Sequence, residues 1–349
     1  MPDAEAETGT YAGLAAAGDP QSLGQSLGPL LRQTCNGRLG EINWFRATWQ
    51  HGGAATGYST WTFDDGRRVD AVVKLPVNFT EWFWTVSLGG VDHGHWERAG
   101  DCPTPRVLAG GEQLAGYDLA WLVFERLQGP TLAGGLDKAG VKELLHCAAE
   151  FHARAESVRP IAEARPPAQE DWGAELEQAR EACRGDRIEN AQHWNALLKQ
   201  LARALPSLVA RWRARPIDTW CHGDLHAHNA MHRTSPSGDP ASNGGAAGRC
   251  VLIDLALVHP GCWIEDALYL ERLYWARPEA LHGVKVVQTL GKYRRENGLA
   301  GNGDASELAN IRRTLMAATA PAFLATEGRP AHLAAALGVL ERLLPMVTR

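Results

Sequence analysis

The sequence predicts an α+β chain of two lobes, with a β-rich amino-terminal lobe followed by a mainly helical carboxy-terminal lobe. Runs rich in β-branched and aromatic residues, separated by turns that contain Gly and Asp, occupy the chain before residue 127. Beyond that point the apolar residues recur at helical spacing. With 349 residues, 45% of them hydrophobic, the chain is long enough to give each lobe its own core.

Three segments follow from this pattern. Residues 1–30 form an amino-terminal extension, of which the first 20 are rich in Ala, Gly and acidic residues and are expected to be partly disordered. A short helix is expected to begin at residue 22 and to end at residue 34, so it crosses from this extension into the small lobe. The small lobe then spans residues 31–126, and the large lobe spans residues 127–349.

The small lobe is predicted to begin with a strand, a glycine-containing connection and a second strand. The β-prone segments 43–50 and 58–63 flank Gly52 and Gly53, and a turn then leads to a third strand at 69–75. Glycines between two strands usually mark only a hairpin. Alone, this order therefore does not identify a binding site.

The boundary between the lobes is expected where a buried-type strand, 120–125, ends in a polar turn. Apolar residues at helical spacing follow at 141–152. Further amphipathic helices are predicted at 168–186 and 188–214, a polar Gly/Ser/Pro-rich surface loop at 233–250, and mainly helix from 264 onward.

The polar residues that indicate chemistry lie in 221–231 and 251–254. Asp224 precedes Asn229 by five positions on a turn that also carries histidine and glycine, and a short apolar run ends at Asp254. Mg²⁺ prefers oxygen ligands, which Asn229 and Asp254 supply, while Asp224 remains available to orient or accept the proton of an attacking hydroxyl. The pattern indicates a phosphoryl-transfer site.

The residues His222, Gly223, Asp224, His226 and Asn229 match the H-G-D-x-H-x-x-N signature of the aminoglycoside phosphotransferase and choline kinase family, which this chain resembles. That family is a small-molecule branch of the protein-kinase-like fold, so the resemblance implies a bilobal kinase-like fold. It also implies a transferase that uses Mg²⁺ to move the γ-phosphate of ATP or GTP to a hydroxyl of an aminoglycoside-like antibiotic or another small metabolite.

The resemblance also gives Asp266, five residues after Gly261, the role of a structural acid that braces the catalytic loop. Two positions depart from the family pattern. Asp254 is followed by Leu255-Ala256 in place of the usual aromatic residue and glycine, and residue 228 is His where a small residue is usual. Neither departure removes an oxygen ligand.

In the small lobe, the resemblance implies a glycine loop whose backbone approaches the phosphates and a third-strand lysine that contacts their oxygens. That lysine needs a helical glutamate as its partner, and both Glu81 and Glu97 qualify by position, with Glu81 preferred. The strand before the linker is expected to offer backbone groups to the nucleotide base. The cofactor-binding residues implied are therefore Gly52, Gly53, Lys74, Glu81, Glu125 and Leu127.

Two other functions stay open. Asp224, His226 and His228 resemble the D-x-H-x-H motif of zinc amidohydrolases, in which alternate residues of a strand bind one metal ion. That motif begins a barrel of roughly 200 residues or more, whereas the 229–349 segment is too short and mostly helical. The other alternative is a nucleotide-binding regulatory protein without turnover, which the intact Asp224, Asn229 and Asp254 set disfavours.

The acceptor cannot be read from the large lobe. Carboxylates that could meet an amino sugar are best interpreted as a solvated helical face, and the aromatic residues as core. The carboxylates are Asp171, Glu175, Glu265 and Glu271, and the aromatic residues are Trp172, Trp194, Trp263, Tyr269, Tyr274 and Trp275.

Composition narrows the partners and the compartment. A formal net charge of -5 gives no reason to expect nucleic acid or an anionic membrane as a partner. Seven scattered cysteines without a Cys-x-x-Cys pair favour a reducing cytoplasm. The acidic start and the lack of an uninterrupted apolar stretch of membrane length favour neither a signal peptide nor a membrane span. The oligomeric state is left open.

Overall fold

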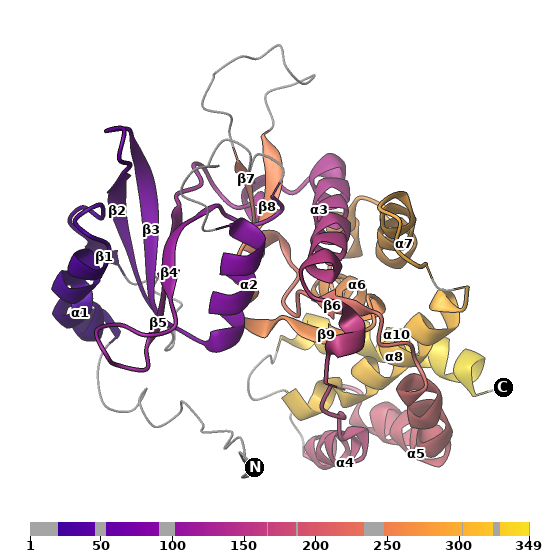
Figure 1. Ribbon diagram of the computed structural model, residues 1–349. Helices are drawn as coiled ribbons and strands as arrows, with labels where there is room; N and C mark the ends of the chain where they lie inside the picture. The colour runs from indigo at the N-terminus through magenta and orange to yellow at the C-terminus, as the bar shows by residue number, and fades with distance from the viewer. Residues whose placement is uncertain are drawn as a thin grey trace, which may run out of the picture. The chain divides into compact units, whose positions relative to one another are not determined.

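The computed structural model describes residues 20–45, 54–90, 102–165, 167–185, 188–233, 248–301, 303–323 and 329–348. The chain divides into two compact units, Met1–Gln128 and Gly129–Arg349 (Figure 1). The predicted tail, the glycine loop with Gly52 and Gly53, the alternative partner Glu97 and most of the 233–250 loop lie outside the described residues.

The first unit is built on a five-stranded antiparallel sheet with the strand order β1-β2-β3-β5-β4 (Figure 1). The predicted strands at 58–63 and 69–75 are present and longer than expected. Helix α1 begins earlier than predicted, at Pro20. The elements are α1 (Pro20–Thr34), β1 (Asn43–Phe45), β2 (Ala55–Thr62), β3 (Arg68–Val77), α2 (Phe79–Gly89), β4 (Val107–Gly111) and β5 (Ala120–Glu125).

Helix α1 packs against the β1–β2 part of this sheet because its glycine allows a close approach. A Cβ atom at Gly24 would lie 2.9 Å from the Cβ of Ala55 and 3.0 Å from the ring of Trp44. The core beneath joins Leu31 of α1 to Leu75 of β3 and to Val123 of β5, all fully buried. This packing supports β3 and β5, the two central strands that carry Lys74 and Glu125.

The second unit is mainly helical and contains two small antiparallel strand pairs, β6–β9 and β7–β8 (Figure 1). The β7–β8 hairpin frames the segment predicted as a polar loop. The helices are α3 (Lys138–Val158), α4 (Trp172–Ala182), α5 (Ala191–Arg213), α6 (Ile264–Leu273), α7 (Val286–Glu296), α8 (Ala305–Thr319) and α10 (Pro330–Val347), and the strands are β6 (Thr219–Cys221), β7 (Ala230–Arg233), β8 (Arg249–Leu252) and β9 (His259–Gly261).

Helix α10 is long and apolar enough to cross a membrane by length and composition, with a mean hydropathy of 1.2. The sequence predicted no membrane span in this segment. In the structure 44% of this helix is buried, and it packs against α8 and α5. Core helices meet the same length and composition test, so this property alone is weak evidence for a membrane span.

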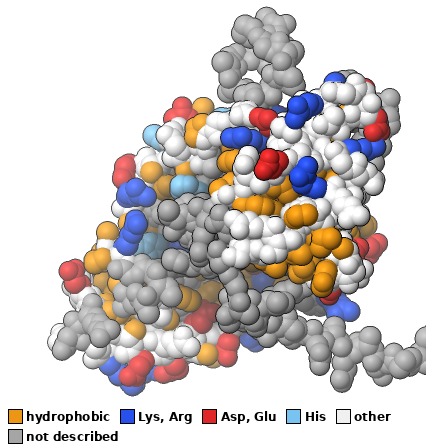
Figure 2. Space-filling model, turned by 90° about the vertical axis from the view of Figure 1, so that its left-hand side faces the viewer, with side chains coloured by type: hydrophobic (Ala, Val, Ile, Leu, Met, Phe, Trp, Pro, Cys, Tyr) orange, Lys and Arg blue, Asp and Glu red, His pale blue; other side chains and the backbone are white. Residues whose placement is uncertain are grey.

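The surface and the cysteines agree with the composition. Figure 2 shows charged side chains of both signs scattered among hydrophobic patches on the face that it presents. All seven cysteines are buried and free, and burial raises the pKa of Cys35 and Cys262 to about 12. The thiols of Cys35 and Cys262 therefore stay protonated and poorly reactive at neutral pH.

The core of the first unit predicts a large cost for one deletion. Leu75→Ala should lower the free energy of unfolding by about 2–5 kcal/mol, because Leu75 is fully buried and its neighbours can only partly fill the void. Denaturant unfolding followed by tryptophan fluorescence measures the change. Tyr117→Ala is the control, since Tyr117 is 58% exposed. Equal costs for the two variants would contradict the assigned core.

Candidate active site

The segment that carries Asp224 lies between β6 and the short 3₁₀ turn Ala227–Asn229 that precedes β7. Its tight course depends on Gly223, whose φ of +83° is unfavourable for other residues. A Cβ atom there would also lie 2.2 Å from the carbonyl oxygen of Leu257. The 3₁₀ turn Leu255–Leu257, which follows Asp254, therefore packs directly on the glycine of the signature.

A buried carboxylate, Asp266 in the first turn of α6, holds this loop. Its Oδ2 accepts the backbone N–H of His222 at 2.8 Å, and its Oδ1 accepts that of Gly223 at 2.9 Å. Two charge-assisted hydrogen bonds to consecutive backbone amides fix the turn immediately before Asp224. The structure thus supports the bracing role that the sequence resemblance suggested for Asp266.

Two residues that the sequence did not single out complete the support of Asp266. Arg294 donates to Nδ1 of His152 at 3.1 Å, so the imidazole proton lies on Nε2 and is donated to Asp266 at 2.9 Å. Burial lowers the pKa of His152, and this effect outweighs the opposing hydrogen bond to Asp266. For Asp266, burial opposes ionisation, but the bond from His152 and nearby charges lower its pKa. Both residues are almost completely buried.

The Asp224 carboxylate has partners on three sides. His226 lies 3.3 Å from Oδ1, the amide of Asn229 donates to Oδ2 at 2.9 Å, and Tyr269 of α6 also forms a side-chain hydrogen bond with it. Burial opposes ionisation, yet these bonds outweigh it and lower the pKa of Asp224 to about 2. The carboxylate is therefore fully ionised at neutral pH. The sequence motif contains His226 and Asn229, but it did not indicate the contact with Tyr269.

Asn229 and Asp254 lie at the same end of the β7–β8 hairpin. Ala230 pairs with Leu252, and the carbonyl of Asn229 then accepts the N–H of Ile253 at 2.9 Å. The ring of His222 donates through Nε2 to the carbonyl of Ile253 at 3.1 Å. The residue before Asp254 is thus fixed to the catalytic loop through both of its backbone groups.

The side-chain oxygens of Asn229 and Asp254 are suitable ligands for a magnesium ion. The NH₂ group of Asn229 is used on Asp224, while its Oδ1 makes no hydrogen bond within the described ranges. Asp254 supplies a carboxylate from a left-handed backbone conformation, with φ of +64°. Mg²⁺ usually takes one or two protein oxygens and fills its remaining sites with phosphates and water. The two side chains match that requirement by ligand type and number.

In the first unit, Lys74 of β3 forms an ion pair with Glu81 of α2. Asn78 caps α2 by accepting the N–H of Glu81 at 2.7 Å, which fixes the first turn of that helix. Glu125, at the end of β5, is buried and accepts the N–H of Arg106 at 2.9 Å, and Leu127 beyond it is half-buried. The structure thus brings together the preferred pair of the sequence prediction.

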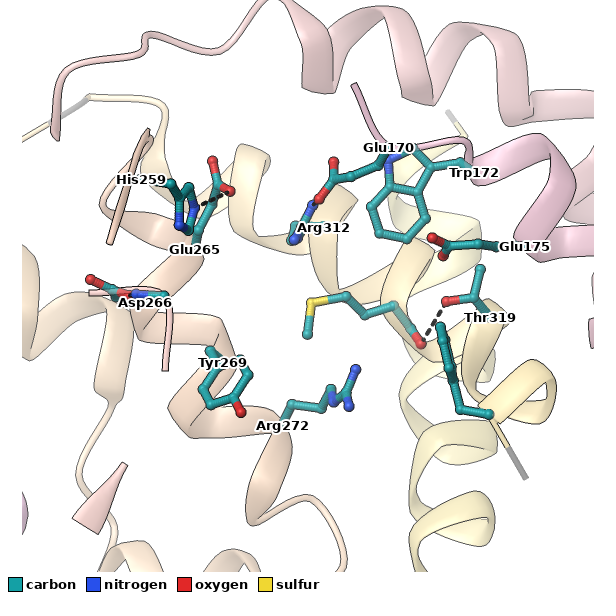
Figure 3. A pocket seen from close by; sticks show the side chains of 13 residues that line it. Glu170, Trp172, Glu175, His259, Glu265, Asp266, Tyr269, Arg272, Arg312 and Thr319 are labelled. Carbon is teal, nitrogen blue, oxygen red and sulfur yellow. Dashed lines mark hydrogen bonds and ion pairs between the residues drawn. The ribbon is translucent and has the colours of Figure 1, made fainter. Parts of the chain in front are cut away.

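A pocket of about 310 Å³ opens in the second unit beside the catalytic loop (Figure 3). Gly223, Asp266 and Tyr269 are among its lining residues, and Tyr269 is also the residue bonded to Asp224. Trp172 and Glu175 of α4 also line it, as Figure 3 shows. Arg312 of α8 and Arg272 of α6 also reach its lining.

For two of the four acidic residues that were interpreted as a solvated face, Glu265 and Glu271, the interpretation is wrong, because both are largely buried in ion pairs. Asp171 is exposed, as expected, and it caps α4 by accepting the N–H of Ala174. Glu265 is paired with Arg215 at 2.9 Å, and Glu271 with Arg313 at 2.6 Å.

Glu175 differs from those three acids. It lines the pocket, and within the described ranges it forms no ion pair and no hydrogen bond through its carboxylate. Burial and the nearby Glu170 raise its pKa. Of the aromatic residues expected in the core, Trp194 and Trp263 are buried, whereas Trp172 and Tyr269 also line the pocket.

The positions of Asp224, His226 and His228 contradict the zinc-hydrolase interpretation. Asp224, His226 and His228 lie on a loop and a 3₁₀ turn, so they do not alternate along a strand. His226 Nδ1 accepts the N–H of His228, and its other nitrogen faces Asp224. Over the part of the chain that the structure describes, no group of three or more His, Cys, Asp or Glu side chains is placed to hold a metal ion.

Comparison with protein families decides the assignment. The model of a phosphotransferase enzyme family matches residues 94–297, which is more than half of the chain. The chain belongs to this phosphotransferase family. It is a kinase-type enzyme that phosphorylates a hydroxyl group, and the predicted resemblance is confirmed.

A solved structure confirms the kinase-like fold of this phosphotransferase. An aminoglycoside phosphotransferase from Alicyclobacillus acidocaldarius is 17% identical over 89% of this chain and 93% of that chain, with a TM-score of 0.52. A macrolide 2'-phosphotransferase from Brachybacterium faecium is 15% identical over 90% of this chain and 98% of that chain, with a TM-score of 0.47. Among curated proteins, no sequence matches the chain significantly. At 17% identity, the likeness to the Alicyclobacillus enzyme shows the fold alone.

Gly223 of this phosphotransferase should tolerate no side chain. Gly223→Ala combines a left-handed φ with a clash against the Leu257 carbonyl, so the loop must shift and thermal stability should fall. Gly66→Ala is the control, because Gly66 has a similar φ of +82° but open space around its Cβ position. A melting temperature of Gly223→Ala equal to or above that of Gly66→Ala would contradict this close packing.

The buried histidine predicts a pH effect on stability. The pKa of His152 is lowered in the folded state, so below pH ~6.5 the unfolded chain binds a proton that the folded chain does not. Stability should therefore fall as the pH is lowered from 7.5 to 5.5. His152→Gln removes this contribution and should show a shallower decrease, measured by denaturant unfolding at each pH. An unchanged slope in the variant would contradict a neutral buried imidazole.

Proposed function

We propose that this chain transfers the γ-phosphate of a purine nucleoside triphosphate, ATP or GTP, to a hydroxyl of a small amine-bearing acceptor such as an aminoglycoside-like compound. The observation that carries the proposal is the ionised Asp224 carboxylate beside a pocket of about 310 Å³. Tyr269 connects the two, since it lines the pocket and bonds Asp224. The Asp224 carboxylate could therefore accept the proton of a hydroxyl that is held in this pocket.

Asp224 acts on the acceptor in this proposal. A carboxylate whose pKa is about 2 is a weak base, so its contribution is chiefly to orient the hydroxyl and to stabilise the positive charge that develops on the attacking oxygen. The proton moves to Asp224 only as the new oxygen–phosphorus bond forms. His226 and Asn229 hold the carboxylate in place during this step.

Asn229 and Asp254 are proposed to hold Mg²⁺, which when bound neutralises charge on the nucleotide phosphates. Lys74, supported by Glu81, is proposed to contact phosphate oxygens, with Gly52 and Gly53 offering backbone amides. Glu125 and Leu127 are proposed to flank the base. The family assignment and the Lys74–Glu81 ion pair support this division of roles.

Glu175 is proposed to bind an amine of the acceptor. Its carboxylate faces the pocket in Figure 3 and forms no ion pair within the described residues, and the Trp172 ring beside it offers a flat apolar surface. Burial and repulsion from Glu170 raise the pKa of Glu175. A cationic amine would offset both effects and would stabilise the ionised carboxylate. The buried free thiols support a reducing compartment such as the cytoplasm.

A nucleotide-consumption screen tests the activity itself. ATP and GTP, each with Mg²⁺, are incubated with amino sugars, macrolides, choline and other hydroxylated metabolites, and the product is checked for a new phosphoester by mass spectrometry. At least one acceptor is expected to be phosphorylated. Nucleotide binding without turnover of any acceptor would favour a regulatory protein, and no binding of either nucleotide would contradict the proposal.

Asp224→Asn should separate chemistry from nucleotide binding. The substitution keeps size and hydrogen bonding but removes the charge, so turnover of the acceptor should fall by about 10²–10⁴-fold. Affinity for Mg²⁺-nucleotide, measured by calorimetry, should stay within about threefold of the parent value because Asn229 and Asp254 are retained. Asp254→Ala should instead lower both the turnover and the affinity for Mg²⁺-nucleotide. Normal turnover in Asp224→Asn would refute its assignment.

Glu175→Gln should selectively weaken binding of the acceptor. KM for an amine-bearing acceptor should rise by about tenfold, the equivalent of ~1.4 kcal/mol, while kcat changes little. Glu177→Gln on the same helix is the matched control, since the Glu177 side chain is 63% exposed and its ion-pair partner is Arg180 of the same helix. If both variants leave KM unchanged, Glu175 is not an acceptor contact.

A further inference from the structure

A second and larger cavity, of about 890 Å³, lies in the helical unit and is separate from the pocket beside Asp224. Its walls come from the end of α6, the turn before α7, the start of α7, and one face each of α8 and α10. No residue from 221 to 229 lines it. Its volume lies in the range of about 300–1,000 Å³ that is usual for small-molecule sites.

The floor of this cavity is apolar and is widened by small residues. Val286, Val287 and Val339 are buried and contribute apolar surface, while Ala309 and Gly338 add little bulk. Trp275 stands at one side, stacked on His332 at a ring distance of 6.0 Å. The lining therefore matches an apolar body of moderate size.

Gly338 is the residue that packing does not explain. It lies inside α10, where glycine is less favourable than any residue except proline, and a Cβ atom at this position would meet nothing within 4 Å. Gly291 of α7 is different, because a Cβ atom there would lie 3.0 Å from the ring of Trp263. The glycine at 338 thus leaves space in the cavity, and no neighbouring residue of the fold requires that space.

The rim of the cavity is cationic. Lys285, Arg313 and Arg342 contribute three positive charges, and Glu271 contributes the one negative charge among the lining side chains. Arg313 and Glu271 form a bidentate ion pair at 2.6 and 2.7 Å, whereas Lys285 and Arg342 have no ion-pair partner among the described residues. The lining carries a net charge of +2 on a chain whose formal net charge is -5.

The start of α7 adds to this positive field. Val286, Val287 and Gln288, its first three residues, line the cavity, and the N-cap residue Lys285 provides no side-chain cap. The first turn also contains no acidic residue. The positive end of the helix dipole and the first N–H groups of α7 therefore lie next to Lys285.

We propose that this cavity binds a small amphipathic anion, with the apolar body on the valine-lined floor next to Gly338 and the anionic group between Lys285 and Arg342. Charge complementarity favours an anion over a neutral or cationic ligand, and the size of the cavity and its apolar lining residues favour a small molecule over an inorganic ion. The proposal is independent of the phosphoryl-transfer activity.

A matched pair of fluorescent probes tests the charge requirement on the full chain. 8-Anilino-1-naphthalenesulfonate carries a sulfonate, and N-phenyl-1-naphthylamine has the same aromatic body without it. The anion is expected to bind with one saturable site per chain and at least about tenfold more tightly than the neutral probe. Equal affinities, or many weak sites with no saturation, would overturn the proposal.

Variants test the position of the site. Gly338→Leu fills the open space with a good helix former and should weaken the sulfonate probe by about tenfold or more, with Gly338→Ala in between. Arg342→Gln should lower the affinity for the sulfonate probe but leave the affinity for the neutral probe unchanged. Arg203→Gln, an exposed cation on α5, is the control and should change neither affinity.

Circular dichroism and size-exclusion chromatography distinguish the remaining outcomes. The variants should keep the parent spectrum and elution volume. If Gly338→Leu alone fails to fold, Gly338→Ala and Arg342→Gln still decide the matter. Unchanged sulfonate affinity in both folded variants would overturn the site. A parent dimer that either variant converts to monomer would identify the cavity as a contact between copies and would also overturn a small-molecule ligand.

Discussion

The carboxylate of Asp266 is the interaction on which the active-site loop depends. It accepts two consecutive backbone N–H groups, at 2.8 and 2.9 Å, immediately before Asp224. A buried carboxylate is costly unless charge and hydrogen bonds compensate it, and here His152 and Arg294 do so from behind. Asp266, His152 and Arg294, three groups far apart in the sequence, thus define one turn. The conformation of that turn determines where the Asp224 side chain can reach.

The same loop explains how Asp224 stays ionised. Three neighbours bond its carboxylate, and their combined effect exceeds the cost of partial burial. Tyr269, one of the three, lies on α6, the helix whose first turn carries Asp266. One helix therefore both shapes the loop through its start and contacts the carboxylate from its middle. This arrangement couples the position of Asp224 to the packing of α6 rather than to the flexibility of a surface loop.

The sequence predicted those features that depend on local pattern. The alternating strands of the first unit, the helical second unit and the spacing of Asp224, Asn229 and Asp254 were all evident, because side-chain period and motif spacing are local properties. The support by Arg294 and His152 was not evident. These residues are separated by more than 140 positions, and nothing local marks a buried arginine as part of a site.

The acidic residues show the same limit. Glu265 and Glu271 have the helical spacing of a solvated face, but both are in ion pairs with arginines remote in sequence, at residues 215 and 313. Helical periodicity defines which face of a helix a residue shares, and the fold alone decides what covers that face. Glu175 was expected on the same face and instead lines the pocket.

The central claim is that Asp266 acts on catalysis chiefly by placing Asp224. A double-mutant cycle on kcat/KM for an accepted hydroxyl acceptor measures this most directly, with Asp266→Asn, Asp224→Asn and the combined variant compared with the parent enzyme. The account predicts strong non-additivity, in which Asp266→Asn lowers kcat/KM in the parent enzyme but changes Asp224→Asn by less than about threefold. Losses that multiply independently in the combined variant would contradict it.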